Sequence, residues 1–166
     1  DVEVQSVKSS ELSQEIKYSG NIEESMKIPL TFSVYGTVTK VFVSEGDFVK
    51  KGELLAVLEN ENYRNTLDLA MATKNQAQDA FNRVLPMYKN GNIPAIKMVE
   101  IETNLKKATA QEAIARKNLK DCSLYSTESG LVGKRQIEPG MISTQNVTSI
   151  EIIKIDTVYA RVSIPE

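Results

Sequence analysis

The chain has 166 residues, enough for one or two small domains, and its charges nearly balance: 20 lysines and arginines against 22 aspartates and glutamates, a formal net charge of −2. No overall field draws it to polyanions, and we expect no nucleic-acid partner. Histidine is absent and Cys122 is the single cysteine, so the commonest general base, the commonest zinc ligand and any internal disulfide are excluded.

Short β-strand signals come first. Residues 1–25 alternate weakly between apolar and polar side chains, which predicts one or two strands. Residues 28–34 form a clearer strand, with Pro29 near its start, where a missing N–H is tolerated. The β-branched residues 37–43 predict another strand, and 54–58 a short buried one. Such signals are typical of a small β-barrel or β-sandwich.

The periodicity changes at residue 60, where apolar and alanine side chains begin to recur at alternating steps of three and four, as in a heptad seam. We predict two antiparallel helices over 60–122, each on the order of 40 Å long. The predicted seam consists of Leu67, Ala70, Lys74, Ala77, Phe81, Val84 and Tyr88, then Met98, Ile101, Leu105, Ala108, Glu112, Ala115, Leu119 and Cys122. Lys74 and Glu112 must pair across this seam or reach solvent.

Two prolines flank the predicted reversal of the chain. Pro86 removes one backbone hydrogen bond and crowds the carbonyl of Asn82, so we predict a kink there or an end of the helix near Leu85. Pro94 suits the first turn of the second helix. Residues 90–94, Asn-Gly-Asn-Ile-Pro, supply the turn itself.

The second half of the chain echoes the first. Gly36 and Gly46 are ten residues apart, and so are Gly130 and Gly140. Each first glycine is followed four residues later by a lysine, and an acidic residue stands close before each second glycine. This internal repeat predicts one β-domain of two similar halves with the helices inserted between them. The glycines interpreted as turn formers are Gly36, Gly46, Gly52, Gly130 and Gly140.

Further strands are predicted after the helices. Residues 123–127 predict one strand, and 150–155 predict the strand that closes the β-domain. Residues 156–157 are a predicted boundary, and 158–164 alternate as a new strand that rejoins residues 1–25.

No stretch approaches the roughly 20 apolar residues that span a bilayer. The chain begins at Asp1 without a methionine or a signal-type apolar run, and it ends at Glu166 within a predicted strand. We interpret both ends as cuts, so a targeting segment or a membrane anchor would lie outside this sequence.

Two half-motifs of the form Gly…Val…Gly-Asp-x-Val-x-x-Gly-x-x-Leu flank the helices, complete in the first half and kept as Gly130…Val132…Gly140 in the second. With the helices inserted between them, the two halves resemble the split biotinyl/lipoyl-like domain of periplasmic adaptor proteins, or membrane fusion proteins, of the HlyD/AcrA-like family. The resemblance covers most of the chain and is carried by Glu-Gly-Asp-Phe-Val-Lys-Lys-Gly-Glu-Leu-Leu-Ala-Val-Leu-Glu at 45–59, by Asn62-Tyr63, Gly130-Leu-Val-Gly and Glu138-Pro-Gly, and by residues 158–166.

The resemblance implies an α+β fold. A lipoyl/biotinyl-like β-sandwich, residues 28–59 and 123–156, would be split by a long antiparallel coiled-coil hairpin, residues 60–122. Residues 1–27 and 157–166 would then be partial strands of an adjacent, membrane-proximal β-barrel domain.

In that family the adaptor links an inner-membrane transporter, here expected to be of the RND type, to a TolC-like outer-membrane channel. It lies in the periplasm, anchored to the inner membrane, and copies form a ring, expected to be a hexamer. The family needs no cofactor and no metal, and we expect no enzymatic activity.

The hairpin tip of these adaptors meets the channel. The family's tip pattern has an arginine, an apolar residue four positions on, and a hydrophobic-serine pair that ends eleven positions after the arginine. Arg83, Met87 and Ile93 keep the first three places, and Pro94 replaces the serine. Together with Asn90 these are the predicted partner-binding residues.

Three alternatives stay open. A true lipoyl or biotinyl carrier shares the half-motif, but its modified lysine would lie between the halves, whereas Lys50 and Lys51 lie in an earlier turn. The sequence argues against an enzyme, because it has no histidine, no nucleophile elbow and no Gly-rich phosphate loop. Adaptors of ABC-type exporters and of heavy-metal efflux systems resemble the chain as well, although no His- or Met-rich tract supports a metal role.

Overall fold

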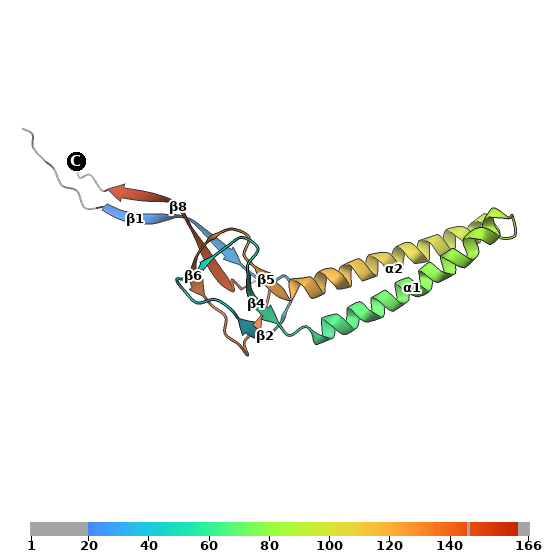
Figure 1. Ribbon diagram of the computed structural model, residues 1–166, viewed down its shortest axis with the longest axis horizontal. Coiled ribbons are helices and arrows are strands. Elements are labelled where there is room, and N and C mark those ends of the chain that lie inside the picture. The colour runs from blue at the N-terminus through green and yellow to red at the C-terminus, as the bar shows by residue number, and fades with distance from the viewer. Residues whose placement is uncertain (1–19, 146, 163–166) are drawn as a thin grey trace, which may run out of the picture.

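The computed structural model describes residues 20–145 and 147–162 and has an α+β fold. Two long helices extend from one end of a small β-sandwich, and a two-stranded ribbon extends from the other end (Figure 1). The elements are β1 (Gly20–Leu30), β2 (Gly36–Val41), β3 (Phe48–Val49), β4 (Leu54–Leu58), α1 (Glu61–Lys89), α2 (Ala95–Asp121), β5 (Ser123–Tyr125), β6 (Gly130–Arg135), β7 (Ile142–Ser143) and β8 (Ile150–Val162).

Two four-stranded antiparallel sheets enclose one hydrophobic core. Their strand orders are β1-β8-β6-β3 and β5-β4-β2-β7. Burying a side chain of the size of Leu or Phe contributes about 1.5–3 kcal/mol relative to leaving it exposed, so this core is what holds the two sheets together. The largest fully buried side chains are Phe32, Leu55, Leu58, Ile150 and Ile152.

The predicted internal repeat is confirmed by the hydrogen bonds between the two halves. Residues of the second half follow their counterparts by 94 positions, as Gly140 follows Gly46. The Gly46 N–H donates to the Val132 carbonyl, and the Gly140 N–H donates to the Val38 carbonyl, both at 2.8 Å. The halves therefore make equivalent contacts with each other, related by an approximate two-fold axis.

β1 ends earlier than the predicted strand 28–34. It stops at Leu30, and the chain then runs irregularly to β2. Phe32 and Val34 are buried all the same, at 1% and 7% exposure. The carbonyl of Ser33, between them, accepts a hydrogen bond from a side chain instead of a neighbouring strand. The alternation in this segment thus reflects burial in the core and not strand pairing.

β8 is one strand where two were predicted. It pairs antiparallel with β1 along the whole of β1, which confirms that the last strand rejoins the N-terminal segment from Gly20 onward. The predicted boundary at 156–157 falls on an irregularity in the pairing, where the register shifts between Glu24 and Met26. A bulge disturbs the ladder without ending the strand, so β8 does not end at the predicted boundary. The strands predicted within 1–19 and 163–166 lie outside the described residues.

The two predicted helices are present and pack against each other. Every buried residue of the two helices lies at a predicted seam position: Leu67, Met98, Ala108, Glu112 and Ala115. Tyr88, also predicted for the seam, is 40% exposed near the end of α1. Burial between the helices therefore includes Met98 in the first turn of α2 but not Tyr88.

Of the two alternatives predicted at Pro86, a kink or an end of the helix near Leu85, the second is wrong, because α1 continues through Pro86 to Lys89. Proline has no N–H, so the bond that residue 86 would give to the Asn82 carbonyl is lost. The carbonyl of Pro86 still accepts a bond from the Asn90 N–H at 3.1 Å. A proline this close to the helix end costs one bond and leaves the last turn in place.

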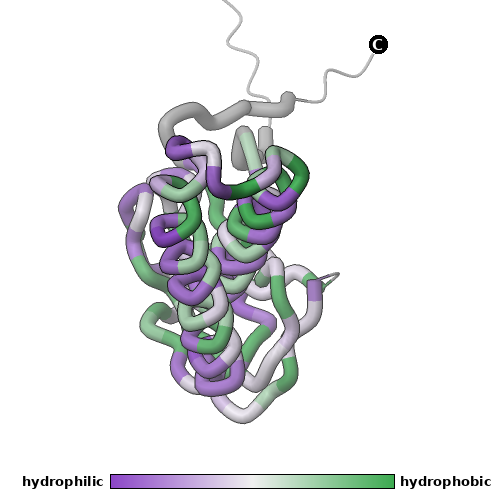
Figure 2. Tube along the Cα trace, turned by 90° about the vertical axis from the view of Figure 1, so that its right-hand side faces the viewer, coloured by the Kyte–Doolittle hydropathy of each residue, from purple (hydrophilic) through white to green (hydrophobic). Residues whose placement is uncertain are grey.

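Both helices are mixed in polarity. Figure 2 looks at the molecule from the end that carries the tip, and hydrophilic and hydrophobic residues alternate around both helices. Within residues 20–145 and 147–162, no helix combines the length and the apolar character needed to cross a membrane.

Candidate functional site

The tip of the helix pair is a tight, well-defined turn. α1 ends in a Schellman motif: the Gly91 N–H donates to the Tyr88 carbonyl, and the Asn92 N–H donates to the Met87 carbonyl, both at 2.9 Å. Gly91 has a φ of 74°, which a residue without a Cβ adopts at no steric cost. This motif satisfies the last carbonyls of α1 and turns the chain towards α2.

Pro94 starts the second helix from the N-cap position. Its φ of −62° and ψ of 146° are extended, and its carbonyl accepts hydrogen bonds from the Lys97 and Met98 N–H groups at 3.0 and 3.4 Å. The serine of the family's pattern would also be able to cap this helix with its hydroxyl, whereas proline has no such donor or acceptor on its side chain. The tip is therefore shaped here by a fixed backbone.

The structure brings the predicted tip residues to one end of the molecule. Arg83, Met87, Asn90 and Pro94 are exposed, and Ile93 is half-buried. Met87 lies one helical turn beyond Arg83 on α1, so the two side chains share a face. Together the five residues form a surface on the last two turns of α1 and the connection to α2, which we call the tip surface.

The guanidinium of Arg83 is available to a partner. Its Nε donates to the Asp79 carbonyl one turn back at 3.3 Å, and no ion pair joins it to a carboxylate in the described part of the chain. A guanidinium without a carboxylate partner keeps most of its donors free for an acceptor on another protein.

Three apolar residues near the tip were not predicted as binding residues. Tyr88, Ile96 and Val99 are 40%, 77% and 56% exposed. Ile96 and Val99 do not belong to the heptad seam, and an apolar residue outside the seam of an otherwise polar helix is the signal that could have identified them. With Met87, they make four exposed apolar side chains near the tip.

The glycines predicted as turn formers divide into two groups. Gly46, Gly52 and Gly140 have φ values of 89°, 82° and 90° and lie in turns. Gly36 and Gly130 are instead the first residues of β2 and β6. A Cβ on Gly130 would lie 2.4 Å from the Ile153 carbonyl oxygen, so that position requires glycine because the backbones approach closely.

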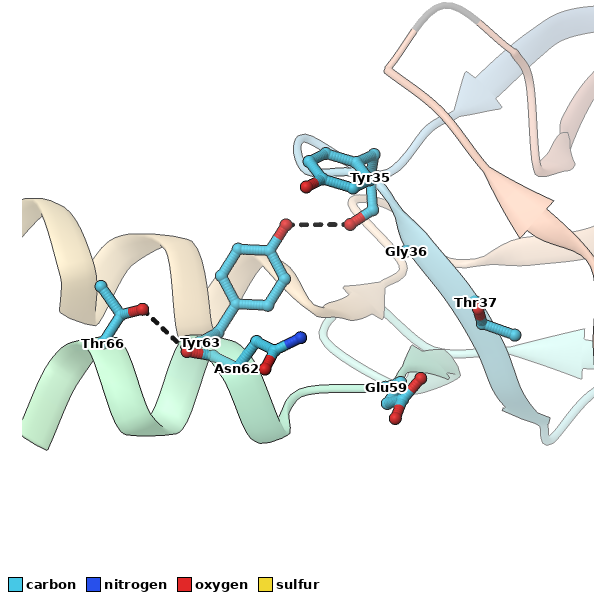
Figure 3. A pocket seen from close by; sticks show the side chains of 7 residues that line it. All are labelled: Tyr35, Gly36, Thr37, Glu59, Asn62, Tyr63 and Thr66. Carbon is cyan, nitrogen blue, oxygen red and sulfur yellow. Dashed lines mark hydrogen bonds between the residues drawn. The ribbon is translucent and has the colours of Figure 1, made fainter.

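A pocket of about 380 Å³ lies where α1 meets the sandwich (Figure 3). It is lined by Tyr35, Gly36, Thr37, Glu59, Asn62, Tyr63 and Thr66. The Tyr63 hydroxyl donates to the Tyr35 carbonyl at 2.9 Å and so ties the first turn of α1 to the segment before β2. Burial, with smaller contributions from Cys122 and Tyr35, raises the pKa of Tyr63 above its ordinary range.

The second junction between helix and sheet is continuous and buried. α2 passes through Cys122, which is 0% exposed, directly into β5, and the Cys122 carbonyl accepts the Leu58 N–H at 2.8 Å. Burial raises the pKa of the Cys122 thiol, so it remains a protonated, inert core residue.

No protein-family model matches the chain. In sequence it is similar to the UPF0194 membrane protein YE2891 of Yersinia enterocolitica, at 34% identity over 105 residues, 61% of this chain and 32% of that protein. It is also similar to the UPF0194 membrane protein Ent638_1286 of Enterobacter sp., at 31% identity over 116 residues, 70% of this chain and 34% of that protein. The chain thus spans about a third of the length of these curated relatives.

Several solved structures share the fold. A MacA-MexA chimeric protein that contains the Pseudomonas aeruginosa MexA α-hairpin domain superposes with a TM-score of 0.82 at 23% identity, covering 90% of this chain and 53% of that one. The membrane fusion protein Spr0693 from Streptococcus pneumoniae R6 superposes with a TM-score of 0.67 at 17% identity, covering 85% of this chain and 66% of that one. The periplasmic adaptor protein EmrA superposes with a TM-score of 0.54 at 16% identity, covering 92% of this chain and 80% of that one. The chain therefore has the fold of the membrane fusion, or periplasmic adaptor, proteins, as its two half-motifs indicated.

Proposed function

We propose that this chain is part of a periplasmic adaptor of a tripartite efflux pump and that its tip surface binds an outer-membrane channel. The observation that carries the proposal is the tip itself: at the far end of two long helices, an arginine with no ion-pair partner in the described part of the chain shares a helix face with the exposed Met87, and further apolar side chains are exposed at the same end. An adaptor of this kind works by geometry, because it holds two partners at a fixed separation without chemistry of its own.

The domain organisation follows from the same proposal. The sandwich, residues 28–59 and 123–156, is a lipoyl/biotinyl-like domain split by an antiparallel coiled coil, residues 60–122. The two-fold relation of its halves and the burial of the heptad seam support this division. Residues 1–27 and 157–166 lead into an adjacent β-barrel domain.

The partners are an inner-membrane transporter of the RND type and a TolC-like channel, with the adaptor anchored in the inner membrane and assembled as a hexamer in the periplasm. The similarity to structures with the MexA α-hairpin and with EmrA supports the adaptor role in general. An ABC-type exporter is the alternative transporter, and purification of the assembled pump from its native host, with identification of the transporter, decides between the two.

A lipoyl or biotinyl carrier is the weaker alternative. The connection between the halves is occupied by α1 and α2, which replace the short turn that presents a modified lysine. The Lys51 ammonium also lies 3.0 Å from the Glu128 carboxylate, an ion pair that holds it on the sandwich. Intact-mass analysis of the protein from its native host should show no lipoyl or biotinyl adduct; such an adduct would establish the carrier function instead.

Replacement of Arg83 by Asp tests the channel contact. The substitution reverses the charge of an exposed helical side chain, so it should abolish export in cells and leave the circular dichroism spectrum and the melting temperature close to those of the wild type. Arg64→Asp is the matched control, because it makes the same change at an exposed position of the same helix near its other end. Normal export by the Arg83 variant would remove the tip hypothesis.

Cross-linking identifies the partner directly. Asn90→Cys and Ile93→Cys place a thiol on the tip surface, while the native Cys122 is buried and does not compete. We expect an adduct between each variant and one outer-membrane channel in cells that assemble the pump. If neither variant forms an adduct with any such channel while export continues, the tip does not bind a channel.

A further inference from the structure

The pocket where α1 meets the sandwich, which we call the junction pocket, combines one negative charge with two tyrosine rings. It is lined by Tyr35, Gly36, Thr37, Glu59, Asn62, Tyr63 and Thr66, and none of these seven is basic. The Glu59 carboxylate has no ion-pair partner in the described part of the chain, and Tyr35 is 72% exposed. A carboxylate attracts a cation through its charge, and a tyrosine ring attracts one through its electron-rich face. The junction pocket therefore has the chemistry of a site for an organic ammonium group.

Hydrogen bonds within the chain hold the walls of the junction pocket in place. The Tyr63 hydroxyl donates to the Tyr35 carbonyl at 2.9 Å, and the Glu59 N–H donates to the Thr37 carbonyl at 2.8 Å. Figure 3 shows Tyr63 rising from α1 towards Tyr35, with Glu59 on the segment that joins β4 to α1. Because three segments of the chain are tied together in this way, a ligand would enter a pocket that is already formed.

A second pocket, of about 350 Å³, continues the junction pocket along the helix pair, and we call it the interhelical pocket. It is lined by Thr66, Leu69, Ala70, Thr73, Gln111, Ile114, Ala115 and Asn118, none of them charged. Thr66 lines both pockets, and Leu69 lies three residues further along the same face of α1. Leu69 and Ile114 are 70% and 61% exposed. The interhelical pocket therefore offers apolar contacts from both helices to an alkyl chain.

We propose that the junction pocket and the interhelical pocket together bind a cationic amphiphile, a molecule with an ammonium group at one end of an alkyl chain. The ammonium group would lie near Glu59 and the two tyrosine rings, and the alkyl chain would extend past Thr66 to Leu69 and Ile114. The charge of one pocket and the apolar lining of the other match the two ends of such a molecule in one orientation only. The inference goes beyond the proposed function and does not depend on it, because it concerns the chain without a transporter or a channel.

The same arrangement disfavours other small molecules. An anionic amphiphile of equal chain length would bring its charge next to the Glu59 carboxylate, and like charges repel each other. A small ammonium ion without a chain would enter the junction pocket but leave Leu69 and Ile114 exposed to water. High affinity should therefore require both the ammonium group and the alkyl chain.

Titration of the purified chain, followed by the amide signals in ¹H–¹⁵N NMR spectra, tests the proposal. The probes are octyltrimethylammonium, octyl sulfate and tetramethylammonium, with the two amphiphiles below the concentrations at which they form micelles. Octyltrimethylammonium should shift the amides of residues 59–73 and 111–118 and bind at least about tenfold more tightly than either other probe. Equal affinity for octyl sulfate, or shifts that leave residues 59–63 unaffected, would overturn the proposal. Binding that weakens as the protein concentration rises would also overturn it, because a second copy of the chain would then occupy the pockets.

Two variants at exposed positions separate the two ends of the site. Glu59→Gln keeps the size of the side chain and removes its charge, so the preference for octyltrimethylammonium over octyl sulfate should disappear. Glu61→Gln is the matched control, because Glu61 lines neither pocket. Ile114→Thr should weaken the binding of octyltrimethylammonium and leave that of tetramethylammonium unchanged, whereas Ile96→Thr, at an exposed isoleucine of the same helix near the tip, should change neither. Unchanged binding by the Glu59 and Ile114 variants, or equal losses in their controls, would overturn the proposal.

Discussion

Lys74 of α1 and Glu112 of α2 form an ion pair across the helix pair, with 3.5 Å between Nζ and Oε2. The Glu112 side chain is only 9% exposed, and its other oxygen accepts a hydrogen bond from Arg116 Nε at 2.7 Å. The hydrogen bond from Arg116, with the charges of Arg116 and Lys74, outweighs burial and lowers the pKa of Glu112. The pair favours one alignment of the two helices, since a shift along the seam would separate Glu112 from Lys74 and leave it only Arg116 of its own helix.

Replacement of Glu112 by Gln should destabilise the helix pair, because it leaves Lys74 and Arg116 without their counter-charge. A carboxyl whose pKa is lowered on folding contributes its stability above the ordinary glutamate pKa of about 4.3 and loses it as the pH falls through the folded pKa. The wild type should therefore lose stability in acid more steeply than the variant. Thermal unfolding followed by circular dichroism from pH 7 to pH 3 measures this difference.

Glu100→Gln is the matched control for that experiment. Glu100 pairs with Lys97 at 2.8 Å, but the Glu100 side chain is 58% exposed, and such a surface pair contributes little. Equal effects of the two substitutions would show that the Glu112 pair is no more important than a surface pair.

The helices and the repeat could be predicted because their signals are local and periodic. Leu67 on α1 and Ala108 and Ala115 on α2 are buried at positions that the periodic pattern of each helix predicts. The pairing of Lys74 with Glu112 follows once both are placed on facing seams. The paired glycines Gly46 and Gly140 are visible as a repeat because both occupy a backbone conformation that favours glycine.

The remaining contacts depend on partners that leave no pattern in the sequence. Tyr63 binds a backbone carbonyl, that of Tyr35, and any residue type at position 35 would supply the same acceptor. β1 ends at Leu30 because no strand in the described part of the chain provides backbone hydrogen bonds to the residues that follow, and the Ser33 carbonyl accepts one from the Gln145 side chain instead. The alternation through Phe32 and Val34 reflects burial alone. The exposure of Ile142 likewise depends on β7 being a sheet edge, which only the three-dimensional strand order reveals.

Gly46→Ala and Gly140→Ala should destabilise the sandwich by similar amounts, because the two glycines are equivalent under the two-fold axis. Their φ values are 89° and 90°, and an L side chain in the left-handed region costs about 1–2 kcal/mol. Urea unfolding of each variant measures the loss. Gly36→Ala is the control, since an added Cβ there meets Leu58 at an ordinary 3.4 Å and needs no unusual φ. A large difference between the Gly46 and Gly140 variants would contradict the equivalence of the halves.

Tyr63→Phe should loosen the junction between α1 and the sandwich. The substitution keeps the ring and removes the hydroxyl that binds the Tyr35 carbonyl, a loss of about 1 kcal/mol for a net hydrogen bond. We expect faster amide exchange in the first turn of α1, measured by hydrogen–deuterium exchange, with the exchange at the buried Cys122 junction unchanged. Tyr88→Phe is the control for removal of a tyrosine hydroxyl from the same helix. Equal exchange in the wild type and the Tyr63 variant would show that the bond does not hold the junction.

Pro86→Ala should strengthen the end of α1 that carries the tip surface. Alanine restores an N–H at residue 86, which can donate to the Asn82 carbonyl, and it removes the ring that crowds this carbonyl. An interior proline costs a helix about 3 kcal/mol, so we expect the stability gained at this near-terminal site to be smaller than that. Slower amide exchange over residues 82–90 is the expected result. Pro94→Ala is the matched control, because proline at the N-cap of α2 displaces no helical donor and its replacement should leave exchange in α2 nearly unchanged. If the Pro86 variant exchanged as fast as the wild type, the missing bond to Asn82 would not limit the stability of the tip, and its shape would depend on the Gly91 turn alone.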